Sequence, residues 1–485
     1  MRRLALSLGL AAMLGACQTA KITPPNLALP AAYEGPQGAG PLTTEQLDHW
    51  WLLFNDPELN GLEADAFRYS PDVRTAAARL MEAHGAEGSQ IAKTFPTGNI
   101  EGNATHERQY DTSSGSSNLI PVGGTYISET ANFNVSWEID LFGRLALQRT
   151  IAKDQYAEAR FNIEGTLASL AANVADDYFQ ARGLAIQIDN ARDTVRIETG
   201  LQRVAERKAE LGLGAASDAD RVSADLSQAQ ATADDLEGQL HAIERQLLIL
   251  VGRGIEPTSI LAVPAQVNDP PPIPSGVPGD LLSRRPDVRE ADAHLRGSTG
   301  LDKLGHRAIF PTFTILPGLG LSRQVQPGVS FIPPSTLIPQ QQTTSVGLWS
   351  IGGGVSIPVL DIPQLLYEAK ADDARTQQAA IAYEKTVQTA YGEAENALVN
   401  LAAAEKAVAV LEVGEVRSHR ASDAAQKRYG MGLDDITAAL SAQQAWRTTR
   451  AALAAERVQA LRDAISTYKA LGGGWAYTAE HVRTQ

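Results

Sequence analysis

Hydrophobic and polar side chains alternate strictly along residues 132–141. The hydrophobic face of this segment carries Phe133, Val135, Trp137, Ile139 and Leu141. A period of two residues predicts a β-strand, and the same period recurs at residues 345–360 and, more weakly, at 312–324 and 97–107. One apolar and one polar face over about nine to eleven residues is typical of a membrane-barrel strand. Any one such strand is also compatible with a soluble β-sandwich.

Long stretches without proline follow two of these segments, at residues 145–211 and 364–429. As one α-helix, each would be about 100 Å long at about 1.5 Å per residue. Charged side chains interrupt both stretches throughout, so neither is suited to cross a membrane. We therefore expect two long helices that project from the strands into water, each followed by a shorter return helix at residues 217–251 and 434–470.

The first return helix carries hydrophobic residues at alternating steps of four and three, which is the pattern of a coiled-coil seam. The seam consists of Val222, Leu226, Ala229, Ala233, Leu236, Leu240, Ile243, Leu247 and Leu250. The second return helix keeps a similar seam, but Gln444 and Arg447 interrupt it. The pattern itself offers no reason for this interruption.

The chain is internally duplicated. Pro-Asp-Val-Arg at residues 71–74 and Phe-Pro-Thr at residues 95–97 recur at residues 286–289 and 310–312, with an offset of 215. Each copy is predicted to run helix, strand, strand, long helix, glycine turn, return helix. Two copies give four strands, which cannot close a membrane barrel, because the smallest closed barrels have about eight strands. Several chains must therefore contribute, and three would supply twelve. The polar stretches 107–126 and 322–344 are predicted to be long loops.

The N-terminus has the features of a secretion signal. Arg2 and Arg3 precede an apolar run that is too short to span a membrane. Leu14-Gly15-Ala16-Cys17 then resembles a bacterial lipobox, and Cys17 is the only cysteine in the chain. We expect cleavage after residue 16, with diacylglycerol and an N-acyl chain on Cys17. The alternative is an ordinary secretory peptide with an incidental cysteine.

Composition excludes several classes of function. The formal net charge is −14, and lysine and arginine form no cluster, so nucleic-acid binding is not expected. The eight histidines are scattered and never paired at the spacing of metal ligands, so no metal site or cofactor besides the lipid is predicted. No phosphate-binding loop or hydrolase motif occurs, and no residues converge on a catalytic constellation, so the protein is not expected to be an enzyme.

Five stretches resemble a known family. They are WWLLFNDPEL from Trp50, SPDVRTAAARL from Ser70, VSWEIDLFGRL from Val135, LLSRRPDVREADAHLR from Leu281 and RYGMGLDDITAALSAQQ from Arg428. The chain is similar to the TolC/OprM outer-membrane efflux channels, most closely to the NodT-type lipoproteins of resistance-nodulation-division pumps. The resemblance implies a mainly α protein with a membrane β-barrel part. It implies a homotrimer with a twelve-stranded barrel in the outer membrane, continued by a long α-helical periplasmic tunnel.

The resemblance also implies a function and partners. The protein would be the exit duct of a tripartite efflux pump that receives small molecules such as drugs. Its partners would be a periplasmic adaptor protein and an inner-membrane resistance-nodulation-division transporter. One alternative is a duct for an ABC-driven type I secretion or metal efflux system. Another is a periplasmic coiled-coil structural lipoprotein without a pore.

These observations divide the chain into six parts. The parts are a signal peptide (1–16), a lipidated tether with an equatorial N-terminal segment (17–66), repeat 1 (67–254), a proline-rich crossover linker (255–284), repeat 2 (285–471) and a tail (472–485). Two motifs depart from the family pattern. The glycine pair usual before the second long helix is absent from Pro358–Gln364, and Leu440-Ser441-Ala442-Gln443 lacks an aspartate that the family often places in the pore constriction.

The turns between long and return helices carry the candidate site. Asp434 and Asp435, and less strongly Asp218 and Asp220, are predicted to form acidic rings at a periplasmic gate. The alternative is that they merely cap helices. Four turn glycines are candidate docking positions for the adaptor protein: Gly212, Gly214, Gly430 and Gly432.

Overall fold

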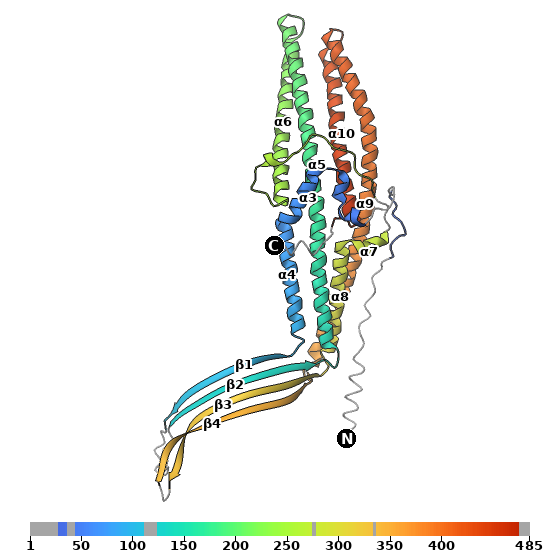
Figure 1. Ribbon diagram of the computed structural model, residues 1–485. Helices are drawn as coiled ribbons and strands as arrows, with labels where there is room; N and C mark the ends of the chain where they lie inside the picture. The colour runs from blue at the N-terminus through green and yellow to red at the C-terminus, as the bar shows by residue number, and fades with distance from the viewer. Residues whose placement is uncertain (1–27, 36–43, 111–123, 274–277, 333–335, 475–485) are drawn as a thin grey trace. The chain divides into compact units, whose positions relative to one another are not determined.

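The structure is a computed structural model that describes residues 28–35, 44–110, 124–273, 278–332 and 336–474 (Figure 1). The predicted signal peptide and the lipidation site Cys17 lie outside the described residues, as does most of the tether. The chain divides into two compact units. The first contains His84–Tyr156 and Leu295–Ala379, and the second contains the described parts of Pro24–Ala83, Ala157–His294 and Ala380–Gln485.

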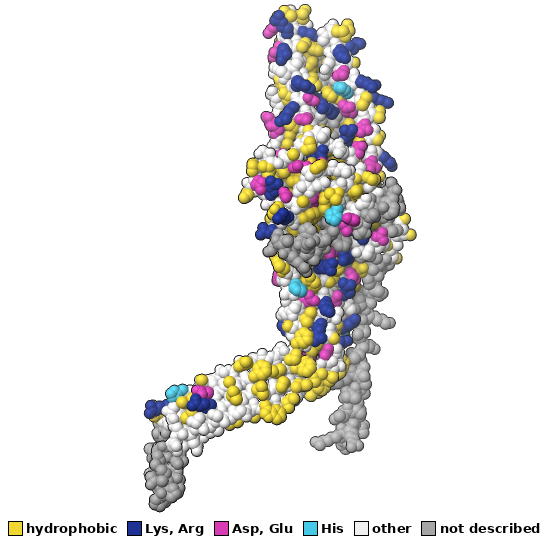
Figure 2. Space-filling view, viewed as in Figure 1, with side chains coloured by type: hydrophobic (Ala, Val, Ile, Leu, Met, Phe, Trp, Pro, Cys, Tyr) yellow, Lys and Arg dark blue, Asp and Glu magenta, His cyan; other side chains and the backbone are white. Residues whose placement is uncertain are grey.

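The first unit holds one antiparallel sheet in the order β1-β2-β3-β4 (Figure 1). Its strands are β1 (Thr97–Gln109), β2 (Gly124–Ile139), β3 (Thr312–Ile332) and β4 (Thr336–Ser356). The register aligns large apolar residues across the sheet: Phe133 pairs with both Ile100 and Leu319, and Leu319 pairs with Trp349. These side chains remain exposed within the chain, Ile100 by 81% and Trp349 by 74%. Figure 2 shows the resulting hydrophobic surface over the strands.

The predicted loop at residues 322–344 is wrong. Strand β3 continues to Ile332 and β4 begins at Thr336, so this stretch is a paired hairpin in which, for example, Gln326 lies opposite Gln342. Val325, Val329 and Phe331 continue the period of two, but Pro327, Gly328 and Pro339 are strong loop signals and led the sequence analysis to predict a loop. The structure shows that the paired strands extend through these positions. The ends of the other strands lie within about three residues of their predicted positions at 97–107 and 127–141.

The long and return helices run close to their predicted bounds. Helix α5 (Arg144–Glu210) has 67 residues and α9 (Ile362–Gly430) has 69. Each is followed by a 35-residue return helix, α6 (Ala216–Leu250) or α10 (Ile436–Ala470). No described helix is long and apolar enough to span a membrane. Helices α4 (Pro71–Ala92) and α8 (Pro286–Arg307) have 22 residues each and open the two repeats.

The second unit contains the main hydrophobic core. The N-terminal segment forms three elements: α2 (Thr44–Asp48), the 3-10 helix η1 (Trp50–Phe54) and α3 (Pro57–Tyr69). Asn55, with a positive φ of 50°, allows the chain to reverse between η1 and α3. Trp50 is fully buried and stacks on Tyr468 with ring centres 5.7 Å apart. This N-terminal segment therefore packs into the core formed by α5, α6 and α10.

A buried polar network fixes the start of α3. Asp56 caps the helix by accepting hydrogen bonds from the backbone N–H groups of Glu58 and Leu59. The same carboxylate accepts hydrogen bonds from the hydroxyl of Tyr178 at 3.1 Å and from the guanidinium of Arg182, both on α5. Because capping and ion pairing use one carboxylate, α3 is tied directly to the long helix.

The crossover linker is mostly irregular. It contains the short elements η2 (Thr258–Ile260), η3 (Pro278–Asp280) and α7 (Leu281–Arg284).

Helix α9 follows strand β4 and begins with Ile362-Pro363, in the segment from which the glycine pair is absent. Proline is favoured at the start of a helix because the missing N–H would be unpaired there. This entry to α9 is therefore stiffer than a glycine pair would make it.

Candidate functional site

Two turns of the same construction close the helical hairpins. Gly212 and Gly432 have positive φ angles of 68° and 73°. After each glycine, a backbone N–H returns to the last helical turn: Leu213 N to Lys208 O at 2.8 Å and Leu433 N to Arg428 O at 2.9 Å. This pattern terminates a helix with a residue in the left-handed region, which glycine adopts without strain. Gly214 and Gly430 do not have positive φ angles, so only two of the four candidate glycines are required by the turn geometry.

The two candidate acidic residues of the second turn have different partners. Arg428 Nε and Nη2 donate to Asp434 at 2.6 and 2.8 Å, which is a bidentate ion pair. These hydrogen bonds hold the pKa of Asp434 below its ordinary value. Asp435 is the N-cap of α10 and accepts a hydrogen bond from the backbone N–H of Ala438 at 2.8 Å. At the second turn, Asp434 is therefore neutralised by an ion pair and Asp435 caps the return helix.

The first turn has a different arrangement. Asp218 lies half-buried in the first turn of α6, and Asp220 is exposed. Lys208 connects the two hairpins of the chain, since its Nζ donates to the carbonyl of Tyr429 at 3.2 Å and lies 3.8 Å from the centre of that ring. A small hydrophobic cluster lies beneath these contacts; it consists of Leu201, Ala205, Val222, Tyr429, Ile436, Ala439 and Leu440.

The interruption of the second seam has a structural reason that the sequence pattern did not reveal. Glu198 on α5 is fully buried, and its Oε1 accepts hydrogen bonds from Arg447 Nη1 at 3.1 Å and Gln443 Nε2 at 3.2 Å. Arg447 also donates to Gln444. Burial raises the pKa of Glu198, and the positive charge of Arg447 opposes that shift. The polar residues Gln444 and Arg447 therefore interrupt the apolar seam of α10 because they take part in an ion-paired contact between α5 and α10.

A groove of about 410 Å³ lies beside this ion pair, between α5, α6 and α10. Its lining includes Asp193, Asp225, Arg447 and Arg450 as well as apolar residues such as Leu236. Arg450 Nη2 lies 3.3 Å from Asp193. The only indication of this site in the sequence was the pair of polar residues, Gln444 and Arg447, inside the predicted apolar seam. A charged residue at such a position requires a partner of opposite charge on the neighbouring helix.

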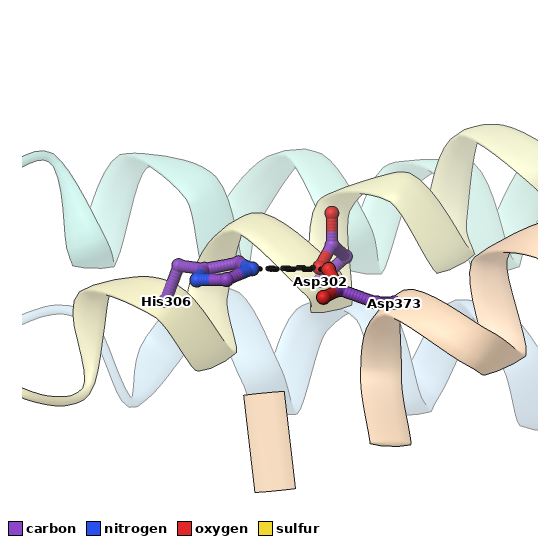
Figure 3. Close-up of side chains that lie close together, drawn as sticks. All are labelled: Asp302, His306 and Asp373. Atoms are coloured by element: carbon purple, nitrogen blue, oxygen red, sulfur yellow. Dashed lines mark hydrogen bonds and ion pairs between the residues drawn. The ribbon is translucent and has the colours of Figure 1, made fainter. Parts of the chain in front are cut away.

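A second cluster joins α8 to α9 in the first unit (Figure 3). His306 Nε2 lies 3.0 Å from Asp373 Oδ1 and 3.4 Å from Asp302 Oδ1. Burial, and then the neighbouring carboxylate of Asp373, raise the pKa of Asp302 to about 6. The predicted absence of a metal site rested on histidine pairs, and this cluster pairs one histidine with aspartates from two helices. Only the Asp302–His306 spacing of four residues is visible in the sequence.

Comparison with known proteins identifies related chains over nearly the whole length. The family model described as "Outer membrane efflux protein" matches residues 64–253 and 277–473. The probable efflux pump outer membrane protein TtgC of Pseudomonas putida is 24% identical over 457 residues, covering 92% of this chain and 90% of that protein. The pyoverdine export outer membrane protein OpmQ of Pseudomonas aeruginosa is 25% identical over 468 residues, covering 96% and 95%.

A solved structure has the same fold. The outer-membrane channel OprN superposes with a TM-score of 0.76 at 24% sequence identity, covering 94% of this chain and 98% of that one. The predicted resemblance to outer-membrane efflux channels is confirmed by these matches, and so is the mainly helical fold with a strand part.

Proposed function

The chain belongs to the outer membrane efflux protein family, and we propose that it is the exit duct of a tripartite efflux pump. In this proposal three copies assemble, and their strands form a twelve-stranded barrel in the outer membrane. Their helices continue the barrel as a tunnel across the periplasm. Small molecules such as drugs pass through the duct without chemical change, and no covalent chemistry is assigned to the protein.

The four-stranded sheet carries this proposal. Strands β1 and β4 form its edges, and their outer backbone groups have no partner strand within the described chain. Each unpaired backbone group in hydrocarbon costs several kcal/mol, so a sheet with a lipid-facing surface must close into a barrel. The exposed apolar face, including Leu319 and Trp349, is suited to contact lipid. Three identical chains supply the strands that one chain lacks.

The proposed partners follow from the helical end of the chain. Leu213 and Leu433 lie exposed at the two turns, where an adaptor protein would find apolar side chains beside a rigid helix end. We assign the adaptor to the periplasm and the transporter to the resistance-nodulation-division class. The names of the relatives, an efflux pump component and a pyoverdine export protein, support cargo of small organic molecules.

Two finer assignments belong to the same proposal. Asp434, Asp435, Asp218 and Asp220 would be repeated around the trimer axis and would favour cations at the narrow end. The pairing of Asp434 with Arg428 compensates the negative charge of Asp434, so this carboxylate would contribute least to the ring. The diacylglycerol and N-acyl chain on Cys17 would hold the N-terminus at the membrane, since more than one acyl chain is needed for a stable anchor.

Two measurements test the proposal. The purified chain is examined by native mass spectrometry in detergent and then inserted into planar bilayers. We expect complexes of three chains and stable conductance. A monomer without conductance would contradict the duct and would favour a non-pore lipoprotein.

The partner is identified by in-cell crosslinking from a photo-reactive residue at Leu433. Recovery of the adaptor of a proton-driven transporter is the expected result. Recovery of an ABC transporter's adaptor instead would assign the duct to secretion. A photo-reactive residue at Ile255, which is fully exposed in the linker, is the matched control for non-specific capture.

A further inference from the structure

We propose that Asp302, His306 and Asp373 bind a divalent first-row transition-metal ion, for which Zn²⁺ is the representative probe. The site would join α8 to α9. The inference is independent of the proposed function, because it rests on the packing of these two helices alone.

The spacing of the three side chains fits a metal ion. Asp302 and His306 lie four residues apart on α8, which places them on one face of the helix, and Asp373 faces them from α9. Zinc bonds of about 2.0 to 2.2 Å in a tetrahedron separate neighbouring ligand atoms by about 3.3 to 3.6 Å. The observed separations from His306 Nε2 are 3.0 Å to Asp373 Oδ1 and 3.4 Å to Asp302 Oδ1. Small side-chain adjustments would therefore complete three ligand positions, with water in the remaining one.

One oxygen of the cluster points independently to a missing partner. Asp302 is only 3% exposed, and its Oδ1 accepts no hydrogen bond from the part of the chain that the structure describes. His306 Nε2 has a single proton to donate, and its hydrogen bond goes to Asp373. Buried carboxylates are normally paired, hydrogen-bonded or bound to metal. A metal ion in place of the proton on His306 Nε2 would bind the carboxylates of both Asp302 and Asp373.

The two helices are held at this distance by other contacts. Gly305 allows the close approach, because a Cβ atom there would lie 2.7 Å from Asp372 Oδ2 and 3.7 Å from Ala369 Cα. Thr376 Oγ1 donates to the carbonyl of Ser298 at 3.0 Å. The ligands are therefore positioned by packing, which is a requirement for a selective metal site.

The donor set selects the class of metal. One imidazole and two carboxylates suit Zn²⁺ and similar divalent ions, whereas Mg²⁺ and Ca²⁺ prefer oxygen ligands alone and Cu⁺ prefers sulfur. The offset of 215 places Glu87 and Ile91 at the positions of Asp302 and His306 in the first copy. The two positive-φ turn glycines, Gly212 and Gly432, differ by 220, and this offset places Lys153 at the position of Asp373. That combination cannot bind a cation in the same way. The duplicated fold therefore forms without the cluster, which is specific to the second copy.

Metal binding is tested on the full-length protein in detergent after treatment with a chelator. Zn²⁺ is titrated by calorimetry in the presence of excess Mg²⁺, and we expect one Zn²⁺ per chain. His306→Asn and Asp373→Asn should each weaken binding at least about tenfold. His419→Asn is the matched control, since His419 also lies near an aspartate four residues away, at 3.7 Å from Asp423, and the described residues form no cluster of three ligands there. It should leave the affinity unchanged.

A spectroscopic measurement separates loss of the site from loss of folding. X-ray absorption of the zinc-loaded native protein should show one imidazole with oxygen ligands, and His306→Asn should lose the imidazole signal. Absence of saturable Zn²⁺ binding, or of imidazole in the native spectrum, would overturn the proposal. So would an affinity that His306→Asn and Asp373→Asn leave intact.

Discussion

Glu198 on α5 and Arg447 on α10 form an ion pair that joins the two helical hairpins. Glu198 has no exposed surface, so removal of its cation leaves a buried charge without compensation. We expect Arg447→Met to lower the free energy of unfolding by about 3 kcal/mol near neutral pH. Chemical denaturation followed by circular dichroism measures the change. Arg450→Met is the matched control, because the Arg450–Asp193 pair is half-exposed and should contribute less than about 1 kcal/mol.

The loss of stability caused by Arg447→Met should depend on pH, and the raised pKa of Glu198 sets the direction of that dependence. Without Arg447 the pKa of Glu198 rises further above its unfolded value, so the folded state binds a proton that the unfolded state releases. A group with a raised pKa loses stability as pH rises. The destabilisation by Arg447→Met should therefore be smaller at pH 5 than at pH 7.5. A deficit that is equal at both pH values would mean that Glu198 is not the charge involved.

Asp177 provides a second prediction at the scale of single residues. Burial raises its pKa to about 6, a hydrogen bond from Gln246 opposes the shift, and one carboxylate oxygen has no hydrogen-bond partner in the described chain. Its ionisation therefore disfavours folding as pH rises from about 4 to about 6. Asp177→Asn should leave stability unchanged at pH 4 and raise the melting temperature at pH 7.5.

The neighbouring carboxylate supplies the control for this prediction. Asp176 accepts hydrogen bonds from Arg462 at 2.6 and 3.0 Å. Asp176→Asn removes a charge from the same stretch of α5 but also breaks an ion pair. It should lower the melting temperature at pH 7.5, and a stabilisation by both variants would indicate a general effect of net charge instead.

At the scale of elements, the left-handed glycines decide where each long helix ends. Gly432 has a φ of 73°, and an alanine there would meet the steric cost of the left-handed region, about 1 to 2 kcal/mol. Gly432→Ala should therefore loosen the turn, and the amide of Leu433 should exchange its hydrogen faster. Gly430→Ala is the matched control because Gly430 is helical and a Cβ atom there would have open space. Equal exchange in both variants would contradict the assigned role.

Most of the elements could be predicted from the sequence, because their signals are local. Period-two alternation located β2, and the absence of proline located α5 and α9 within two residues of their ends. The hairpin at residues 322–344 was missed because Pro327, Gly328 and Pro339 are loop signals, although Val325 and Val329 continue the period of two. The ion pair of Glu198 could not be predicted either. Its partner lies 249 residues away in the sequence, and only the folded helices bring the two together.

At the scale of the whole molecule, the exposed apolar face of the sheet must meet lipid if the strands form a barrel. Leu321 is 67% exposed on this face, and the adjacent residue Ser322 has its side chain on the opposite face of the strand. Leu321→Arg would place a charge against hydrocarbon at a cost of about 2 to 4 kcal/mol near the membrane centre. We expect it to reduce the amount of heat-resistant oligomer recovered from outer membranes severalfold. Ser322→Arg should assemble normally, because a residue facing the interior of a barrel is solvated. If both variants assemble equally well, this face does not contact lipid. If Ser322→Arg alone fails, the two faces have been assigned the wrong way round.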